Sequence, residues 1–179
     1  MRPYAFANCS LLSQISFPAC TDIPSGAFAR CSQLKSAIFP LCEIINNSAF
    51  YYCTSLTTIN FPICKKIGPV AFSNCSTLST VFFPACESVG QFAFGYCSKL
   101  RTASFPSCLY IGTYAFYSCK SLTALYLMGS SFCSLAGSTA FSSTPFTGTS
   151  GYIYVPSSLY DTYKTAANWS YFSSRFVSM

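Results

Sequence analysis

The chain has 179 residues, of which 51% are hydrophobic and 8% are charged, a balance typical of a folded domain and not of a disordered tail. Ten Lys and Arg against four Asp and Glu give a formal charge of +6, but no Lys/Arg-rich run indicates nucleic-acid binding. Histidine is absent, which removes the commonest general base and excludes Ser-His and Cys-His nucleophile pairs.

The N-terminal segment carries no recognisable targeting signal. Met1-Arg2-Pro3-Tyr4 is not followed by an apolar stretch, so no signal peptide is visible. No run of about 18 apolar residues occurs further along, so no membrane span is predicted.

From Phe6 onward, a phenylalanine followed three positions later by a cysteine recurs at every eleventh position. Ala precedes the phenylalanine in one half of the pattern and Pro follows it in the other half, so the true period is twice as long. A fixed period in the low twenties is typical of a solenoid. The repeated cysteines are Cys9, Cys20, Cys31, Cys42, Cys53, Cys64, Cys75, Cys86, Cys97, Cys108 and Cys119.

Each full repeat, or coil, follows the pattern L-x-x-Φ-x-F-P-x-C-x-x-I, as Leu12, Ile15, Phe17 and Cys20 show. The alternation around Ile15 predicts a short strand with its middle side chain inward, and Pro18 ends it because proline cannot donate a ladder hydrogen bond. Parallel crossovers are expected to be right-handed. The predicted fold is an α/β-type solenoid with a parallel strand ladder and few helices.

These units resemble BspA-like leucine-rich repeats, whose second half reads I-G-x-x-A-F-x-x-C. Ile67-Gly68, Ala71-Phe72 and Cys75 show that half, and the resemblance covers residues 5–127. The chain departs from the family in its second cysteine column and in Pro24 and Asn46, which replace the glycine. The resemblance implies an adhesion or recognition protein of bacteria or some protists, located outside the cell or on its surface.

The two cysteine columns allow three interpretations: buried thiols, disulfides between coils, or metal ligands. Metal sites favour close pairs such as C-x-x-C, and none occurs. Cysteines on adjacent coils could approach within disulfide range, but the second column has five members and cannot pair off completely. We predict mainly reduced, buried thiols and neither a metal nor a cofactor.

The repeat lapses at Met128, which stands where proline is expected. We therefore divide the chain into a solenoid of six coils (residues 1–128) and a capping module (residues 129–179). Residues 129–150 are rich in Ser, Thr and Gly and are expected to form a loosely packed connection and a degenerate coil.

The segment from Gly151 to the end of the chain is predicted to form a small α+β cap that covers the final coil. A strand is expected over 151–156 and a helix over 159–167, capped by Ser157 or Ser158. Trp169, Phe172 and Phe176 are expected to fold back over the last coil. The opposite, N-terminal end is predicted to be uncapped, either as the edge of a fragment or as a self-association surface.

Two sequence features could suggest catalysis, and each has a simpler interpretation. Ser32 and Lys35 match S-x-x-K, but the companion motifs of that enzyme class are missing. Glu43 and Glu87 occupy the same column two coils apart with Lys65 between them, which indicates an exposed charge ladder rather than a catalytic pair.

The predicted function is a non-catalytic binding or adhesion module that recognises a host or bacterial protein, peptide or glycan through the strand face. Self-association through the N-terminal edge is a further possibility, and the alternative function is a structural spacer or a phage-tail-like display protein. Two outward columns flank the inward aliphatic residue of each strand, and aromatic anchors among polar neighbours suit binding. The candidate partner-binding residues are Gln14, Ser16, Lys35, Ile38, Thr58, Asn60, Thr80, Phe82, Arg101, Ser104 and Tyr126.

Overall fold

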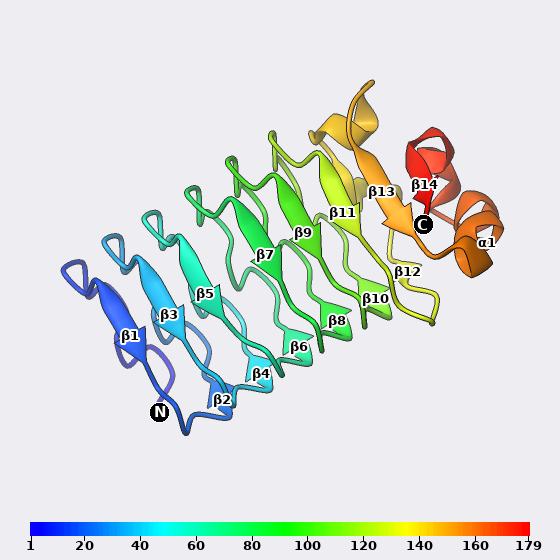
Figure 1. The fold of residues 1–179 in the computed structure, drawn as a ribbon. Helices are drawn as coiled ribbons and strands as arrows, with labels where there is room; N and C mark the ends of the chain where they lie inside the picture. The colour runs from blue at the N-terminus through cyan, green and yellow to red at the C-terminus, as the bar shows by residue number, and fades with distance from the viewer.

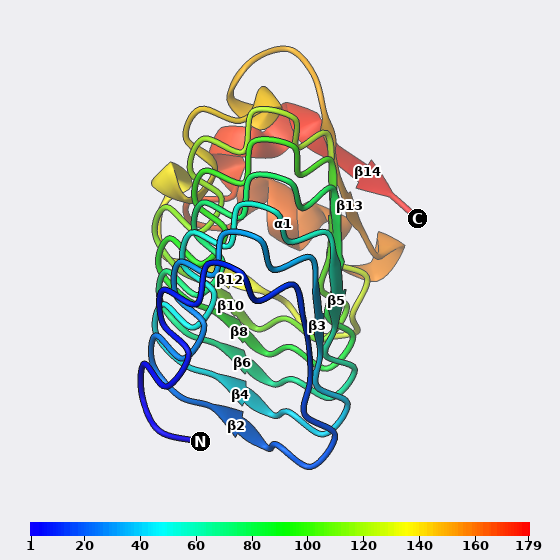
Figure 2. The ribbon, with the colours of Figure 1, turned by 90° about the vertical axis from the view of Figure 1, so that its left-hand side faces the viewer.

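The computed structural model describes residues 1–179 as a stack of coils with the N-terminus at one end and a helical cap at the other (Figure 1). Viewed along the stack, the coils superpose as one ring behind another (Figure 2). Parallel strands in register connect successive coils. The predicted leucine-rich-repeat solenoid with few helices is confirmed.

The predicted strand of each coil forms the first of two ladders, which we call the long-strand ladder. Its middle residue points inward and its two outer residues point outward, as in β7, where Val81 is buried between Thr80 and Phe82. The ladder consists of β1 (Gln14–Ser16), β3 (Ser36–Ile38), β5 (Thr58–Asn60), β7 (Thr80–Phe82), β9 (Thr102–Ser104), β11 (Ala124–Tyr126), β13 (Tyr152–Val155) and β14 (Phe176–Ser178).

A second ladder of two-residue strands, the short-strand ladder, lies on another side of each coil (Figure 2). These strands could not be predicted from the sequence because such short segments show no alternation. The repeat pattern reveals only their inward member, the Ile column that begins at Ile23. The strands are β2 (Asp22–Ile23), β4 (Ile44–Ile45), β6 (Lys66–Ile67), β8 (Ser88–Val89), β10 (Tyr110–Ile111) and β12 (Ser134–Leu135). All six are joined without interruption.

The core between the ladders consists largely of stacked phenylalanine rings. In the column from Phe6 to Phe141, neighbouring ring centroids lie 5.1–5.4 Å apart with interplanar angles of 12° or less. A second column, from Phe17 to Phe105, stacks at 5.5–5.9 Å. Burying one such ring contributes roughly 1.5–3 kcal/mol, so each coil depends on its neighbours to cover it.

The cysteine columns serve the backbone in two different ways. In the first column, each thiol from Cys31 to Cys119 donates to the carbonyl of the phenylalanine of the preceding coil, as from Cys53 Sγ to Phe28 O at 3.1 Å. In the second column, the thiol donates within its own coil, as from Cys64 Sγ to Lys66 O at 3.4 Å. The predicted burial is confirmed for ten of the twelve cysteines, whereas Cys9 is exposed and Cys20 is partly exposed.

Residues 132–146 continue the packed core, so the expectation of a loose connection was wrong for them, whereas residues 147–150 are exposed. Phe141 stacks on Phe116 at 5.4 Å and continues the first phenylalanine column. Cys133 is fully buried, and β12 joins the short-strand ladder. The 3-10 turns η1 (Ser138–Phe141) and η2 (Pro145–Thr147) complete this coil. Its repeat motif is lost while its inward positions are kept.

The cap closes the stack with one short helix and several turns. It comprises β13, η3 (Ser157–Leu159), α1 (Tyr160–Thr165), η4 (Ser170–Arg175) and β14. Trp169 Nε1 donates to Cys133 O at 2.7 Å, and Tyr163 Oη accepts from Cys133 N at 3.0 Å, so both ring systems are anchored on the last coil. The predicted serine N-cap was wrong: Ser157 Oγ donates to Met179 O, because the chain end returns beside it.

Candidate functional site

The long-strand ladder has one break, between β5 and β7, and the candidate site lies there. In the other coils, the residue before the strand donates to its counterpart one coil back, as from Arg101 N to Ser79 O at 2.8 Å. The corresponding bond from Ser79 N is not made, and neither is the bond from Phe61 N to the β7 coil. Two strand edges therefore present free backbone groups at the centre of this face.

Side-chain crowding accounts for the break. From β1 to β11 the inward column places Ala37 and Ala103 between bulky residues on either side of the break. At the break, Val81 follows Ile59 with no alanine between them, and both are branched at Cβ and stiff. Leu125 and Ile153 also face each other without an alanine, but Leu125 is not branched at Cβ and their strands remain paired. Ile59 is only half-buried, in contrast to the other inward residues of these strands.

An open hollow of about 370 Å³ occupies the break. Phe82 forms one wall, with 60% of its surface exposed, and Asn60 and Thr58 lie on the facing strand. We call it the aromatic hollow; its lining residues are Thr57, Thr58, Ile59, Asn60, Phe61, Pro62, Thr80, Phe82 and Pro84.

A second hollow of about 340 Å³ begins at Thr80, which lines both. Every residue around it is polar or charged, and Lys99 and Arg101 supply two positive charges. We call it the basic hollow; its lining residues are Ser79, Thr80, Lys99, Arg101, Thr102 and Ser121.

The eleven residues predicted for binding are distributed along one face, and the two hollows gather only part of them. Thr58, Asn60, Thr80 and Phe82 line the aromatic hollow, while Thr80 and Arg101 line the basic one. The remaining residues lie on the same face outside the hollows: Gln14, Ser16, Lys35 and Ile38 in the first two coils, and Ser104 and Tyr126 in β9 and β11.

Tyr126 was expected to be exposed, and this was wrong. Its ring stacks on Tyr154 of β13 with centroids 4.5 Å apart, and the residue is half-buried. The register of β11 and β13 places the two tyrosines directly opposite each other. The stack could not be predicted from the repeat pattern because the path from β11 to β13 is longer than one regular repeat.

Lys99 and Ser121 of the basic hollow were not among the predicted binding residues. Lys99 lies two positions before Arg101, and Ser121 occupies the same position one coil later. Their separation by one full repeat indicates that they lie side by side on adjacent coils, but neither residue lies in a strand or next to one.

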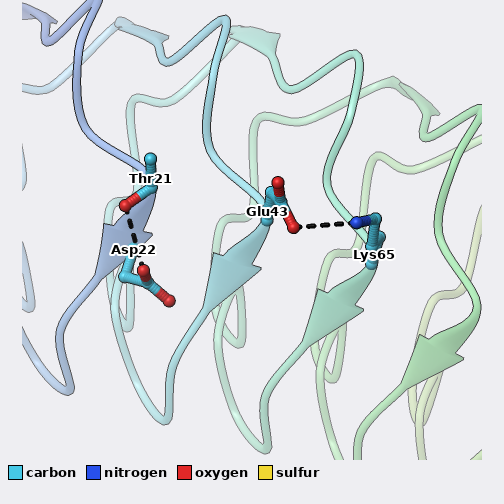
Figure 3. Close-up of polar contacts among 4 residues, drawn as sticks. All are labelled: Thr21, Asp22, Glu43 and Lys65. Atoms are coloured by element: carbon cyan, nitrogen blue, oxygen red, sulfur yellow. Dashed lines mark hydrogen bonds and ion pairs between the residues drawn. The ribbon is translucent and has the colours of Figure 1, made fainter.

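The carboxylates lie elsewhere on the molecule. Asp22, Glu43 and Glu87 belong to the short-strand side, and Asp161 belongs to the cap helix. Lys65 Nζ lies 2.8 Å from Glu43 Oε2 across adjacent coils (Figure 3). The hydrogen bond to Glu43 and the charge of that carboxylate raise the pKa of Lys65. This confirms the Glu43–Lys65 step of the expected ladder, while Glu87 makes no ion pair.

Neither the thiols nor the largest hollow provides a better candidate for the functional site. Burial raises the pKa of Cys31 to about 11 and that of Cys42 and Cys64 to about 12, so these thiols are protonated and unreactive at neutral pH. A hollow of about 670 Å³ lies against the first coil, between Phe6, Phe17 and Cys20. These are core positions that a neighbouring coil covers elsewhere in the stack.

A stack of short parallel strands with an inward Leu, Phe and Cys pattern defines a leucine-rich-repeat protein. The model of the BspA type leucine rich repeat region matches residues 1–123 and 43–168 in six copies, so the chain belongs to this family. The chain has one short α-helix, α1, and no helix is long and apolar enough to cross a membrane. No curated protein matches the chain.

Three solved structures show how far the similarity extends. A leucine rich cell surface protein of Faecalibacterium prausnitzii is 28% identical with a TM-score of 0.70, over 87% of this chain and 42% of its own. A leucine-rich repeat protein of Bacteroides ovatus is 26% identical with a TM-score of 0.60, over 69% and 39%. The leucine rich repeat protein of T. pallidum is 26% identical with a TM-score of 0.50, over 71% and 51%. The chain thus spans about half or less of each of these proteins.

Proposed function

We propose that the chain is a non-catalytic binding or adhesion module whose site is the long-strand face around the two hollows. The observation that carries the proposal is Phe82, which is 60% exposed beside strand edges whose backbone groups are free. A large aromatic side chain in a hollow with polar neighbours is the usual anchor of a binding site. The proposed partner is a host or bacterial protein or glycan.

The absence of suitable acid–base groups on this face supports a non-catalytic role. No histidine or carboxylate lies in or beside either hollow, and the cysteines beneath them are buried. Binding therefore accounts for the available chemistry better than turnover does.

We further propose that the chain is displayed at a cell surface, that residues 129–179 cap the solenoid of residues 1–128, and that the first coil is a self-association edge. The description of the F. prausnitzii relative as a cell surface protein supports the location. The stacking of Phe141 on Phe116 and the pairing of β12 with β10 support the capping role. The apolar hollow at Phe6 and Phe17 supports the third proposal.

The experiment is a binding screen of purified matrix proteins and glycans with two matched variants. Phe82→Ala removes the aromatic anchor, and Leu109→Ala removes a side chain of similar exposure (46%) near the short-strand ladder. Both variants should fold normally, because exposed substitutions usually change stability by less than about 0.5 kcal/mol. Phe82→Ala should weaken binding by about 2 kcal/mol or more while Leu109→Ala leaves it unchanged. Equal binding by both variants would remove the long-strand face as the site.

A structural spacer or appendage-like display role is the second candidate. The uninterrupted short-strand ladder and the stacked phenylalanine column favour it, because both run through the stack. The same screen separates the two functions, since a spacer would bind no ligand through Phe82.

A further inference from the structure

The long-strand side of the coils carries positive charge without any carboxylate. The segments that carry this side contain Lys35, Lys99, Arg101 and Lys120 and not one carboxylate. The carboxylates of the coils lie on the short-strand side, where the chain's single ion pair is formed. The cations beside the long strands are therefore not neutralised by the protein.

Within this face, the basic hollow is lined with donors that have no partner in the protein. Lys99 and Arg101 make no ion pair, and the hydroxyls of Ser79, Thr80, Thr102 and Ser121 make no side-chain hydrogen bond within the molecule. These groups come from three successive coils and surround one hollow. Their arrangement suits a group that accepts hydrogen bonds in several directions and carries negative charge.

We propose that the basic hollow binds a sulfate group of a sulfated glycan; this rests on the proposed function of the long-strand face as a binding site. The sulfate ester of a glycan presents three acceptor oxygens in different directions, which suits donors that line one hollow from three coils, whereas a carboxylate offers two oxygens in one plane. A glycan also supplies hydroxyls for the Ser and Thr side chains and a sugar face for Phe82 in the adjoining aromatic hollow.

The lining of the hollow offers no pocket for an apolar side chain. Apolar pockets hold the anchoring side chains of most bound peptides, and the basic hollow has no apolar lining residue. It lies on the ladder one coil beyond the break, with Thr80 shared, so an extended chain of sugars can pass from one hollow into the other.

The test measures binding of a fluorescent heparin-derived oligosaccharide to the full chain by anisotropy at about 0.15 M salt, where long-range attraction is screened. Lys99→Gln with Arg101→Gln removes both charges of the hollow. The charge-matched control, Lys65→Gln with Lys66→Gln, removes two charges from the short-strand side. The site variant should weaken binding by at least about tenfold and the control by less than about twofold.

Two competitor ligands decide the ligand class. The chemically desulfated oligosaccharide should bind at least about tenfold more weakly, because its charge-assisted bonds are lost. A glutamate-rich peptide should not compete. Equal weakening of binding by both double variants would show that net charge, and not the basic hollow, drives binding. Competition by the peptide that depends on Lys99 and Arg101 would show that the hollow binds acidic peptides. Either result overturns the proposal. Absence of oligosaccharide binding, with the Phe82→Ala effect on another ligand intact, would overturn this inference and leave the proposed function standing.

Discussion

Left-handed backbone recurs at two positions of every coil, on either side of its Ala-Phe pair. The first column consists of Tyr4, Gly26, Ser48, Val70, Phe92 and Tyr114, and the second of Asn8, Arg30, Tyr52, Asn74, Tyr96 and Ser118. A positive φ costs an ordinary residue roughly 1–2 kcal/mol, and β-branched residues tolerate it least. The stacked coils impose this geometry whatever residue stands there, so the cost differs from coil to coil.

Val70 should be the most strained of these positions. Its φ is 61° although its side chain branches at Cβ. Val70→Gly is expected to raise the free energy of unfolding by about 1 kcal/mol, because glycine adopts this conformation freely. Urea denaturation measures the change. Val177→Gly, at a half-buried position in the extended strand β14, should have the opposite sign, and a loss of stability in both variants would show that Val70 is not strained.

The buried thiols predict a loss of stability at alkaline pH. Burial raises the pKa of Cys64 from 9.0 to about 12, so the folded state holds a proton that the unfolded state releases. The stabilising effect is complete below about pH 9 and declines as pH rises towards 12, by up to about 1.4 kcal/mol per pH unit for one thiol.

Urea denaturation of the wild type and a Cys64→Ala variant between pH 8 and pH 10.5 isolates this effect. The stability difference between them should shrink as pH rises, and a constant difference would contradict the buried, protonated thiol.

In parallel, thiol titration in denaturant should count close to twelve free thiols after anaerobic purification. A count near zero that reductant restores would instead establish disulfides.

At the scale of the strands, the sequence periodicity predicted the long-strand ladder but not the short-strand ladder. The repeat pattern placed Ile15 and Val81 inward correctly, because a regular repeat forces each coil into the same path. The short strands could not be predicted, since such brief segments carry no periodicity. The break at Ile59 depends on which inward residues meet across adjacent coils, which becomes visible only when the columns are compared residue by residue.

The candidate site was predictable only in outline for the same reason. Phe82 and Thr80 were found because they flank an inward residue, whereas Lys99 and Ser121 come together through the bend before the strand. Tyr154 lies beyond the regular repeat, so its stacking on Tyr126 had no periodic signal.

Val81→Ala should close the ladder between β5 and β7. With the smaller side chain, Ile59 can turn inward as the other inward residues do, and the bonds from Ser79 N and Phe61 N can form. Amide hydrogen exchange of these two groups should slow by at least about tenfold, since exchange then requires local opening. Val89→Ala makes the same chemical change in the short-strand ladder and should leave both amides unaffected. If the exchange rates of the Ser79 and Phe61 amides are unchanged in Val81→Ala, side-chain crowding does not cause the break.

At the scale of the whole molecule, stability accumulates from contacts between neighbouring coils. One continuous cluster of buried side chains runs from Ile15 to Phe176, with no gap between solenoid and cap. In such an array, each coil is stabilised by the coils that cover it, so the effect of a core substitution depends on its position along the stack.

Leu78→Ala and Leu12→Ala test this dependence with one chemical change. Leu78 is fully buried between two coils, and its truncation should cost about 2–5 kcal/mol. Leu12 is half-buried in the first coil, so its truncation should lower the free energy of unfolding markedly less. Thermal and urea denaturation of both variants give the comparison. Equal costs would show that the first coil is covered in solution, for example by a second copy of the chain.

The break in the long-strand ladder also has a mechanical consequence. On the short-strand side, backbone hydrogen bonds join every pair of neighbouring coils, so that side resists stretching along its whole length. On the long-strand side, one step between β5 and β7 lacks them. A bending load would therefore concentrate at that step, with the unbroken side acting as the hinge. A ligand bound at this step and in contact with both strands would stiffen the solenoid. A pulling force on the solenoid would in turn change the shape of the binding site.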